Sequence, residues 1–203
     1  LFFAEVTYLK IPEKNEFFLE AQRKIAFNYS YIKKGDDVEN KIISIVKKNN
    51  EDHELKKILA DFYRIEKKYD LAINIYSDLI QNNFGEAWHI FYLRGICHEQ
   101  SNNWKKAELD FVQSLAMKKD SPNVLNYLAY GWIERGIKIE ESFKMLTDAY
   151  NSNPDSYYIL DSLAWAYYKK KEYIKAAELM EKVIDMVPGE VISLDHLGDI
   201  YFK

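Results

Sequence analysis

Residues 157–190 read YYILDSLAWAYYKKKEYIKAAELMEKVIDMVPGE. The stretch closes just after Pro188, which follows Pro154 by 34 positions, and a segment with helical patterning precedes each of these prolines. Lys170 and Lys171 separate its two apolar-rich halves. A fixed interval of this length indicates a repeated pair of antiparallel helices.

The same period extends in both directions without gaps. Successive units begin near Leu19, His53, Trp88, Pro122, Tyr157 and Val191. The first helix of each unit holds one small residue, in turn Ala26, Ala60, Gly95, Ala129, Ala164 and Gly198. We therefore predict a single array over 1–203, with repeats at 19–52, 53–87, 88–121, 122–156 and 157–190, the second helix of a truncated repeat at 1–18 and the first helix of another at 191–203.

The alternation of small and large side chains has a packing reason. Two helices approach closely only where side chains are small, and large residues one turn away fill the flanking space. A single hairpin buries too little apolar surface, so several hairpins must stack. At the carboxyl end Leu194, Leu197, Ile200 and Tyr201 are expected to face a missing partner helix, which predicts a chain cut within a repeat and a possible homo-oligomer through this uncapped end.

In its period and small-residue positions the chain resembles the tetratricopeptide-repeat family over residues 19–203. The resemblance implies an all-α fold, a right-handed superhelix of αα-hairpins. More narrowly, the segments at 124–136, 158–168 and 195–201 resemble bacterial, especially proteobacterial, members of the lipoprotein and protease-adaptor type. That likeness implies a periplasmic or membrane-associated setting, although the sequence has no lipid-attachment cysteine and carries Ala129 and Ala164 where glycine is usual.

Composition bounds the class of partner. The chain is 48% hydrophobic and 30% charged, with a formal net charge of -4 and both signs mixed along it. Mixed charge disfavours nucleic acid and anionic membranes as partners. No run is long enough to span a bilayer, and Cys97, the single cysteine, cannot form an intramolecular disulfide.

The resemblance places the first helix of each unit on the concave face, where such arrays bind ligands. In the second half of the chain, the residues expected on this concave face are aromatic and acidic, which predicts a partner segment that is basic or rich in amides. The expected aromatic anchors are Trp165 and Tyr130, and the expected acidic group is a carboxylate trio of Asp161, Asp195 and Asp199. Inward positions of the first half include the charged residues Glu20, Arg23, Lys57, Asp61 and Arg64. The expected partner-binding residues are Phe27, Tyr31, Tyr92, Asn126, Tyr130, Tyr158, Asp161, Trp165, Tyr168, Asp195 and Asp199. About half of their rings are expected to pack between repeats instead.

Patterns typical of catalysis are missing from the sequence. The four histidines are scattered, His98 at a packing position and His196 at a position expected to be exposed, and glycine is too sparse for a phosphate loop. We therefore expect no enzyme activity, metal or cofactor.

The leading hypothesis is a protein- or peptide-binding scaffold or adaptor. The alternatives are a regulatory segment of a longer chain and self-association through open repeat ends.

Overall fold

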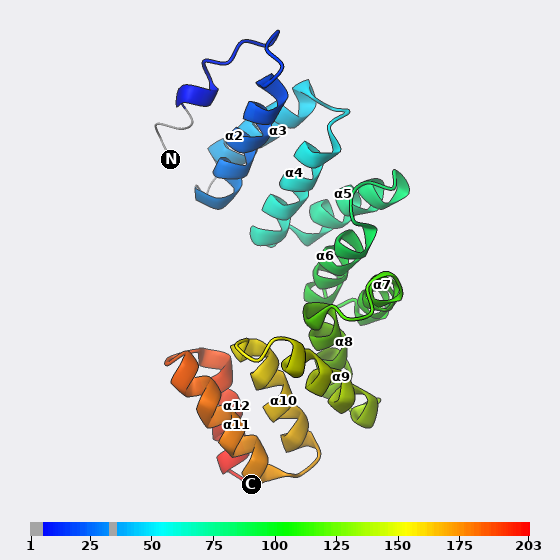
Figure 1. Ribbon diagram of the computed structural model, residues 1–203, viewed down its shortest axis with the longest axis vertical. Helices are drawn as coiled ribbons and strands as arrows, with labels where there is room; N and C mark the ends of the chain where they lie inside the picture. Colours follow the sequence, from blue (N-terminus) through cyan, green and yellow to red (C-terminus); the bar gives the residue numbers. More distant parts are fainter. Residues whose placement is uncertain (1–5, 33–35) are drawn as a thin grey trace. The chain divides into compact units, whose positions relative to one another are not determined.

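The computed structural model describes residues 6–32 and 36–203 (Figure 1). Over these residues the regular structure is α-helical throughout, which confirms the all-α prediction. The helices are α2 (Phe18–Ile32), α3 (Asp36–Lys48), α4 (His53–Ile65), α5 (Tyr69–Gln81), α6 (Ala87–Gln100), α7 (Trp104–Met117), α8 (Pro122–Glu134), α9 (Ile139–Ser152), α10 (Tyr157–Lys169), α11 (Tyr173–Met186) and α12 (Val191–Tyr201).

The helix expected at the amino end falls partly on residues 1–5, which lie outside the described residues. From there on, residues 6–8 are helical and a turn follows them. The chain forms two compact units, Leu1–Ala107 and Glu108–Lys203, and the boundary between them falls within α7. A single array over residues 1–203 stays a prediction.

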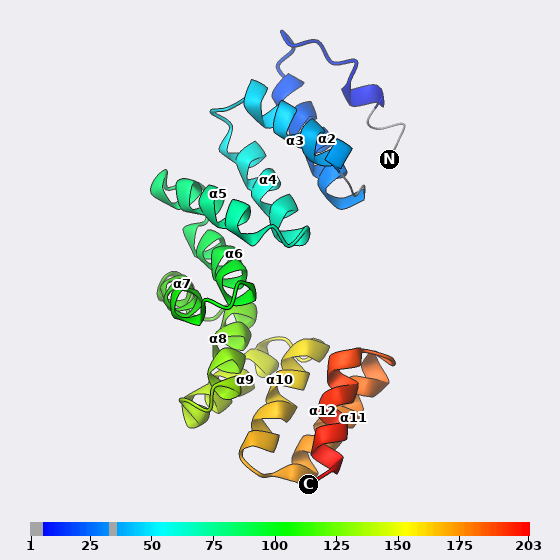
Figure 2. The same ribbon diagram turned by 180° about the vertical axis from the view of Figure 1, so that it is seen from behind.

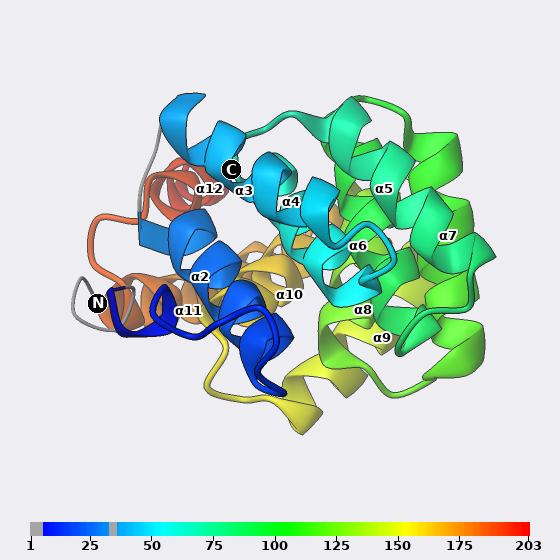
Figure 3. The ribbon, with the colours of Figure 1, turned by 90° about the horizontal axis from the view of Figure 1, so that it is seen from above.

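The first unit is built from paired helices that share one apolar core. Helices α2, α3 and α4 lie side by side (Figure 3), and α5 packs against both α4 and α6. Ala60 of α4 and Ala72 of α5 are fully buried, and Phe62 and Tyr76 are buried near them in the same core. Small residues therefore sit in the interior, as the alternation of small and large side chains predicts.

The second unit repeats this arrangement with other side chains. Helices α10, α11 and α12 lie side by side (Figures 1 and 2), and α9 pairs with α8. Ala164 and Ala176 are fully buried beside Met180 and Val183. Gly198 is different, because it is exposed and an added Cβ would meet no atom within 4 Å. Among the described residues no helix follows α12, so the close contact expected at Gly198 stays a prediction.

The turns of four hairpins, from α4–α5 to α10–α11, share one backbone geometry. A residue with positive φ follows the first helix, at Lys67, Asn102, Gly136 and Lys171 in turn. The next amide N–H donates to the carbonyl of the aromatic residue five positions earlier, for example Lys68 N to Tyr63 O at 2.8 Å and Glu172 N to Tyr167 O at 3.0 Å. This bond is the Schellman pattern that satisfies a free carbonyl at a helix end. An aromatic residue of the first helix therefore supplies the carbonyl that closes each of these turns: Tyr63, His98, Trp132 and Tyr167.

Candidate functional site

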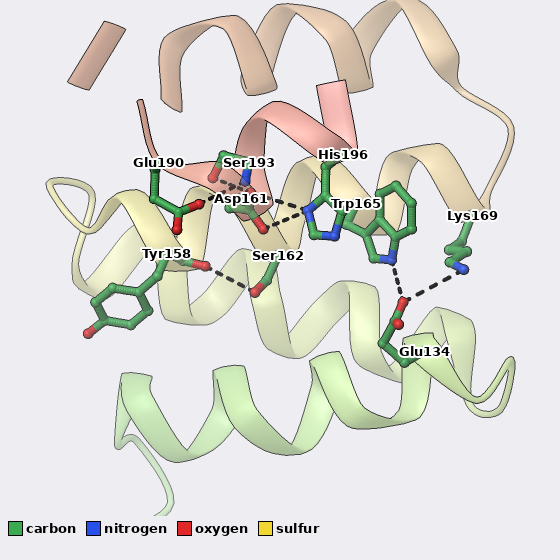
Figure 4. A network of polar contacts seen from close by, with 9 residues as sticks. All are labelled: Glu134, Tyr158, Asp161, Ser162, Trp165, Lys169, Glu190, Ser193 and His196. Carbon is green, nitrogen blue, oxygen red and sulfur yellow. Dashed lines mark hydrogen bonds and ion pairs between the residues drawn. The ribbon is translucent and has the colours of Figure 1, made fainter. Parts of the chain in front are cut away.

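In the second unit, the predicted anchor Trp165 lies inside the protein. It is only 6% exposed, and its ring stacks on Tyr168 at 4.5 Å and on His196 at 4.1 Å between centroids. Its indole N–H donates to Glu134 of α8, which also faces Lys169 (Figure 4). Trp165 therefore joins α8, α10 and α12 and leaves little ring surface for a partner.

A buried polar cluster lies next to this stack. The Asp161 carboxylate accepts a hydrogen bond from Ser193 Oγ at 2.7 Å, and His196 Nδ1 lies 3.1 Å from its Oδ2 (Figure 4). Ser193 and His196 come from α12 and are buried, so the expected exposure of His196 is wrong. The contacts from α12 to Asp161 account for this, because a buried ring nitrogen needs a hydrogen-bond partner.

The carboxylate trio expected from the sequence does not form one surface. Asp195 and Asp199 are exposed on α12, whereas Asp161 is 8% exposed and bonded to the other face of that helix. Residues four apart share a helix face, so Asp195 and Asp199 stay together. The positions that contact Asp161 are Ser193 and His196 instead.

The remaining predicted residues of this unit differ in exposure. Asn126 is buried, and its Oδ1 has no hydrogen-bond partner among the described residues. Tyr130 and Tyr168 are half-buried against the apolar core of the unit. Tyr158 is more exposed and donates its hydroxyl to Asn123 Oδ1 at 2.8 Å. Most of these rings therefore pack between repeats.

The cluster contains the residue types of a hydrolytic triad but not its geometry. In a triad the serine hydroxyl must hydrogen-bond the histidine that takes its proton. Here Ser193 donates to Asp161 and both groups are buried.

Among residues 6–32 and 36–203, no group of three or more His, Cys, Asp and Glu side chains is placed to hold a metal ion. Within the same residues, no helix is both long and apolar enough to cross a membrane.

In the first unit, helices α2 and α4 border an open cleft of about 400 Å³. Its lining residues are Tyr8, Glu20, Arg23, Lys24, Phe27, Asn28, Glu54 and Ile58. Phe27 is 51% exposed, and Tyr31 one turn further is 61% exposed, with their ring centroids 4.6 Å apart. Two predicted binding rings are therefore accessible on α2.

Arg23, which lines this cleft, forms an ion pair with Asp52. Arg23 donates from Nη2 to Asp52 Oδ2 at 2.7 Å and from Nε at 3.1 Å, and the Asp52 side chain is only 4% exposed. Asp52 also caps α4 by accepting the Leu55 N–H at 2.8 Å. Burial by itself would raise the pKa of the Asp52 carboxyl, but the bonds from Arg23 and Leu55 outweigh burial and lower that pKa. The same pair raises the pKa of Arg23.

Next to the cleft, the α4–α6 surface holds a second set of paired charges. Lys57 Nζ lies 2.9 Å from Asp61, and the buried Tyr76 hydroxyl also donates to Asp61. Burial, followed by the charge of Asp61, raises the pKa of Tyr76 and keeps it neutral. Burial and the nearby Lys57 lower the pKa of His89, which is therefore neutral at pH 7. Tyr92, a predicted binding residue, is half-buried beside the His89 ring.

Sequence reasoning reached part of the cleft. Glu20, Arg23 and Phe27 are inward positions of the first unit and do line it, whereas Tyr8, Lys24 and Asn28 were missed. Glu54 was missed too, although it is the second residue of the unit that begins at His53, as Glu20 is the second residue of the unit that begins at Leu19. Treating the second residue of every unit as an inward position finds Glu54.

Helix pairs with buried small residues and a recurring hairpin turn define a helical-repeat solenoid protein. No family model matches the sequence. Over 116 residues the chain is 26% identical to a TPR repeat-containing protein of Pseudomonas aeruginosa, covering 57% of this chain and 20% of that protein. The chain thus spans about a fifth of the length of this curated relative.

Solved structures share the fold. YrrB, described as a TPR protein with an unusual peptide-binding site, matches with a TM-score of 0.66 at 14% identity over 93% of this chain and 96% of its own. A thermophilic TPR protein of Thermus thermophilus matches with a TM-score of 0.68 at 11% identity over 91% of this chain and 100% of its own. The chain therefore has the fold of tetratricopeptide-repeat proteins, and its similarity to a Pseudomonas protein agrees with the bacterial resemblance of the sequence.

Proposed function

We propose that the chain is a non-catalytic scaffold or adaptor that binds a protein or peptide segment on its inner helices. The observation that carries this proposal is the cleft between α2 and α4, where exposed aromatic rings adjoin an open hollow. Aromatic side chains give a large contact area with few rotors to freeze, so they are frequent binding anchors. The peptide-binding site in the name of YrrB adds support from a protein of the same fold.

The second unit contributes a rigid support in this proposal. Trp165, Asp161 and His196 join three helices, so we assign them to holding the inner surface in shape. Exposed Asp195, Asp199 and Tyr158 remain available as secondary contacts on that unit. The expected anchor role of Trp165 is the least supported part of the sequence-based site.

Two further candidates rest on specific observations. The chain spans only 20% of its Pseudomonas relative, which favours a binding segment within a longer protein, such as the lipoprotein and protease-adaptor type. On α12, exposed apolar side chains include Val191, Ile192 and Leu194, which favours self-association. Concentration-dependent sedimentation that disappears when a polar capping helix is added after Lys203 supports self-association; sedimentation that does not change with concentration removes it.

A random-peptide phage selection on the full chain tests the scaffold proposal. Phe27→Ala removes a half-exposed ring from the cleft wall, and Leu71→Ala removes a similarly exposed apolar side chain from α5, outside the cleft. Loss of a buried aromatic contact costs about 2 kcal/mol, which is more than tenfold in Kd. We expect Phe27→Ala to weaken the selected peptides by that factor and Leu71→Ala to leave them unchanged. Equal binding to both variants, or no enriched peptide, contradicts the proposal.

A further inference from the structure

The ionised groups around the α2–α4 cleft are unevenly paired. Arg23 is held by Asp52 through two nitrogens and lies 3.8 Å from Glu20. Lys24 Nζ lies 3.5 Å from the other oxygen of Glu20. Both cations that line the cleft are therefore already matched by carboxylates.

Glu54 is the exception. It lines the cleft from the first turn of α4, and its carboxylate makes no ion pair or side-chain hydrogen bond with any residue in 6–32 or 36–203. It is half-buried, and its charge reaches Arg23 strongly enough to help raise that group's pKa. Counting Glu20, Asp52 and Glu54 against Arg23 and Lys24 gives three negative and two positive charges, a net charge of -1.

Apolar surface adjoins this carboxylate. Ile58 lies one turn after Glu54 on α4 and is 6% exposed, and it lines the cleft together with Phe27 and Tyr8. Asn28 also lines the cleft and is half-buried, so a side-chain amide able to donate and accept is present there. A volume of about 400 Å³ has room for one or two side chains of a bound segment.

We propose that this cleft selects an extended peptide segment in which an apolar side chain lies next to a lysine or arginine. The apolar side chain packs on Ile58 and Phe27, and the cation pairs with Glu54. This inference rests on the proposed scaffold function and names the chemistry of its partner. It also moves the preference for a basic segment from the second unit, where the sequence placed it, to the first.

An acidic segment fits the same cleft less well. It would have to displace Asp52 from Arg23 or Glu20 from Lys24, and it would stand beside the unpaired Glu54. Breaking a pair whose carboxylate is 4% exposed leaves a buried charge without compensation, which is costly. Charge complementarity therefore favours the basic segment.

The test uses the random-peptide selection on the full chain and two substitutions, Glu54→Gln and Glu54→Lys. Glu66 at the carboxyl end of α4 gives matched controls, Glu66→Gln and Glu66→Lys, because twelve positions separate it from Glu54, about 18 Å along the helix. Peptides enriched on the wild-type chain are expected to carry Lys or Arg within two positions of an apolar residue. A partly exposed ion pair contributes up to about 1 kcal/mol, so Glu54→Gln should weaken these peptides about fivefold.

Charge reversal provides the sharper comparison. Selection on Glu54→Lys should enrich Asp or Glu at the position that held the cation, while Glu66→Lys keeps the wild-type preference. Peptides that depend on Phe27 but show no basic preference, or an acidic one, overturn the inference and leave the scaffold function standing. Absence of any Phe27-dependent peptide overturns both.

Discussion

Removing the buried carboxylate of Asp161 should loosen α12 from α10. The carboxylate is the acceptor for Ser193 Oγ and for His196 Nδ1, and both partners are buried. Asp161→Ala strands these two donors, at roughly 1–3 kcal/mol for each group left without a partner. Two such groups together would cost roughly 2–6 kcal/mol. The serine hydroxyl can rotate towards another acceptor, so we expect a total in the lower half of that sum, about 3 kcal/mol.

Asp161→Asn separates shape from charge. Asparagine has nearly the same volume and keeps one oxygen to accept the Ser193 hydroxyl, so its cost should be smaller, about 1 kcal/mol. Asp195→Ala is the matched control, because Asp195 is exposed on the same helix as His196. An exposed substitution of this kind stays within about 0.5 kcal/mol.

Urea unfolding and hydrogen exchange together give the assay. In stacked hairpins each repeat contacts only its neighbours, so the damage should be local. Amides of Val191–Tyr201 should exchange roughly a hundredfold faster in Asp161→Ala, while those of α8 and α9 change little. Equal unfolding free energies for Asp161→Ala and Asp195→Ala would refute the role of this cluster in joining the helices.

Two further predictions concern the first unit and the hairpin turns. The pKa of Asp52 is lowered from 3.8 in the folded chain, so the Arg23 pair should stabilise fully above that pH and lose its effect as pH falls through the lower folded pKa. Asparagine at position 52 can still cap the helix but cannot form the ion pair with Arg23. The urea midpoints of the wild type and Asp52→Asn should therefore differ at pH 7 and converge in acid. A difference that does not change with pH contradicts this prediction. Lys171 has φ 65°, a left-handed conformation that glycine adopts without strain. Lys171→Gly should therefore raise the free energy of unfolding by about 0.5 kcal/mol, measured by thermal unfolding. A Tm lower than that of the wild type would contradict the idea that the backbone at Lys171 is strained.

Much of the fold follows from local pattern. The interval between Pro154 and Pro188, with buried Ala164 and Ala176 inside it, predicts paired antiparallel helices, because small residues mark where helices must touch. Gly198 shows the limit of the rule. Its identity matches the pattern, yet it lies exposed, since a small residue permits a close contact but does not supply the helix that makes it.

The site was less predictable. Trp165 and Phe27 both occupy inner helices and are both aromatic, yet Trp165 is 6% exposed and Phe27 is 51% exposed. The difference comes from the neighbouring rings: His196 and Tyr168 cover the indole, whereas Phe27 contacts the ring of Tyr31, which is itself exposed. Sequence spacing gives the face of the helix and not the side chains that lie across from it.

By itself, the sequence determined the all-α repeat, its period and the positions where its helices approach, because these depend on residue size and helical spacing within about 34 residues. Only the tertiary structure decided which charges are paired. Arg23 and Asp52 are separated by 29 positions, and Asp161 and His196 by 35, so their pairing depends on stacked helices that no local pattern describes. Within the described part of the chain, Glu54 has no ion-pair partner for the same reason: the cations that line the cleft with it, Arg23 and Lys24, are already paired with Asp52 and Glu20.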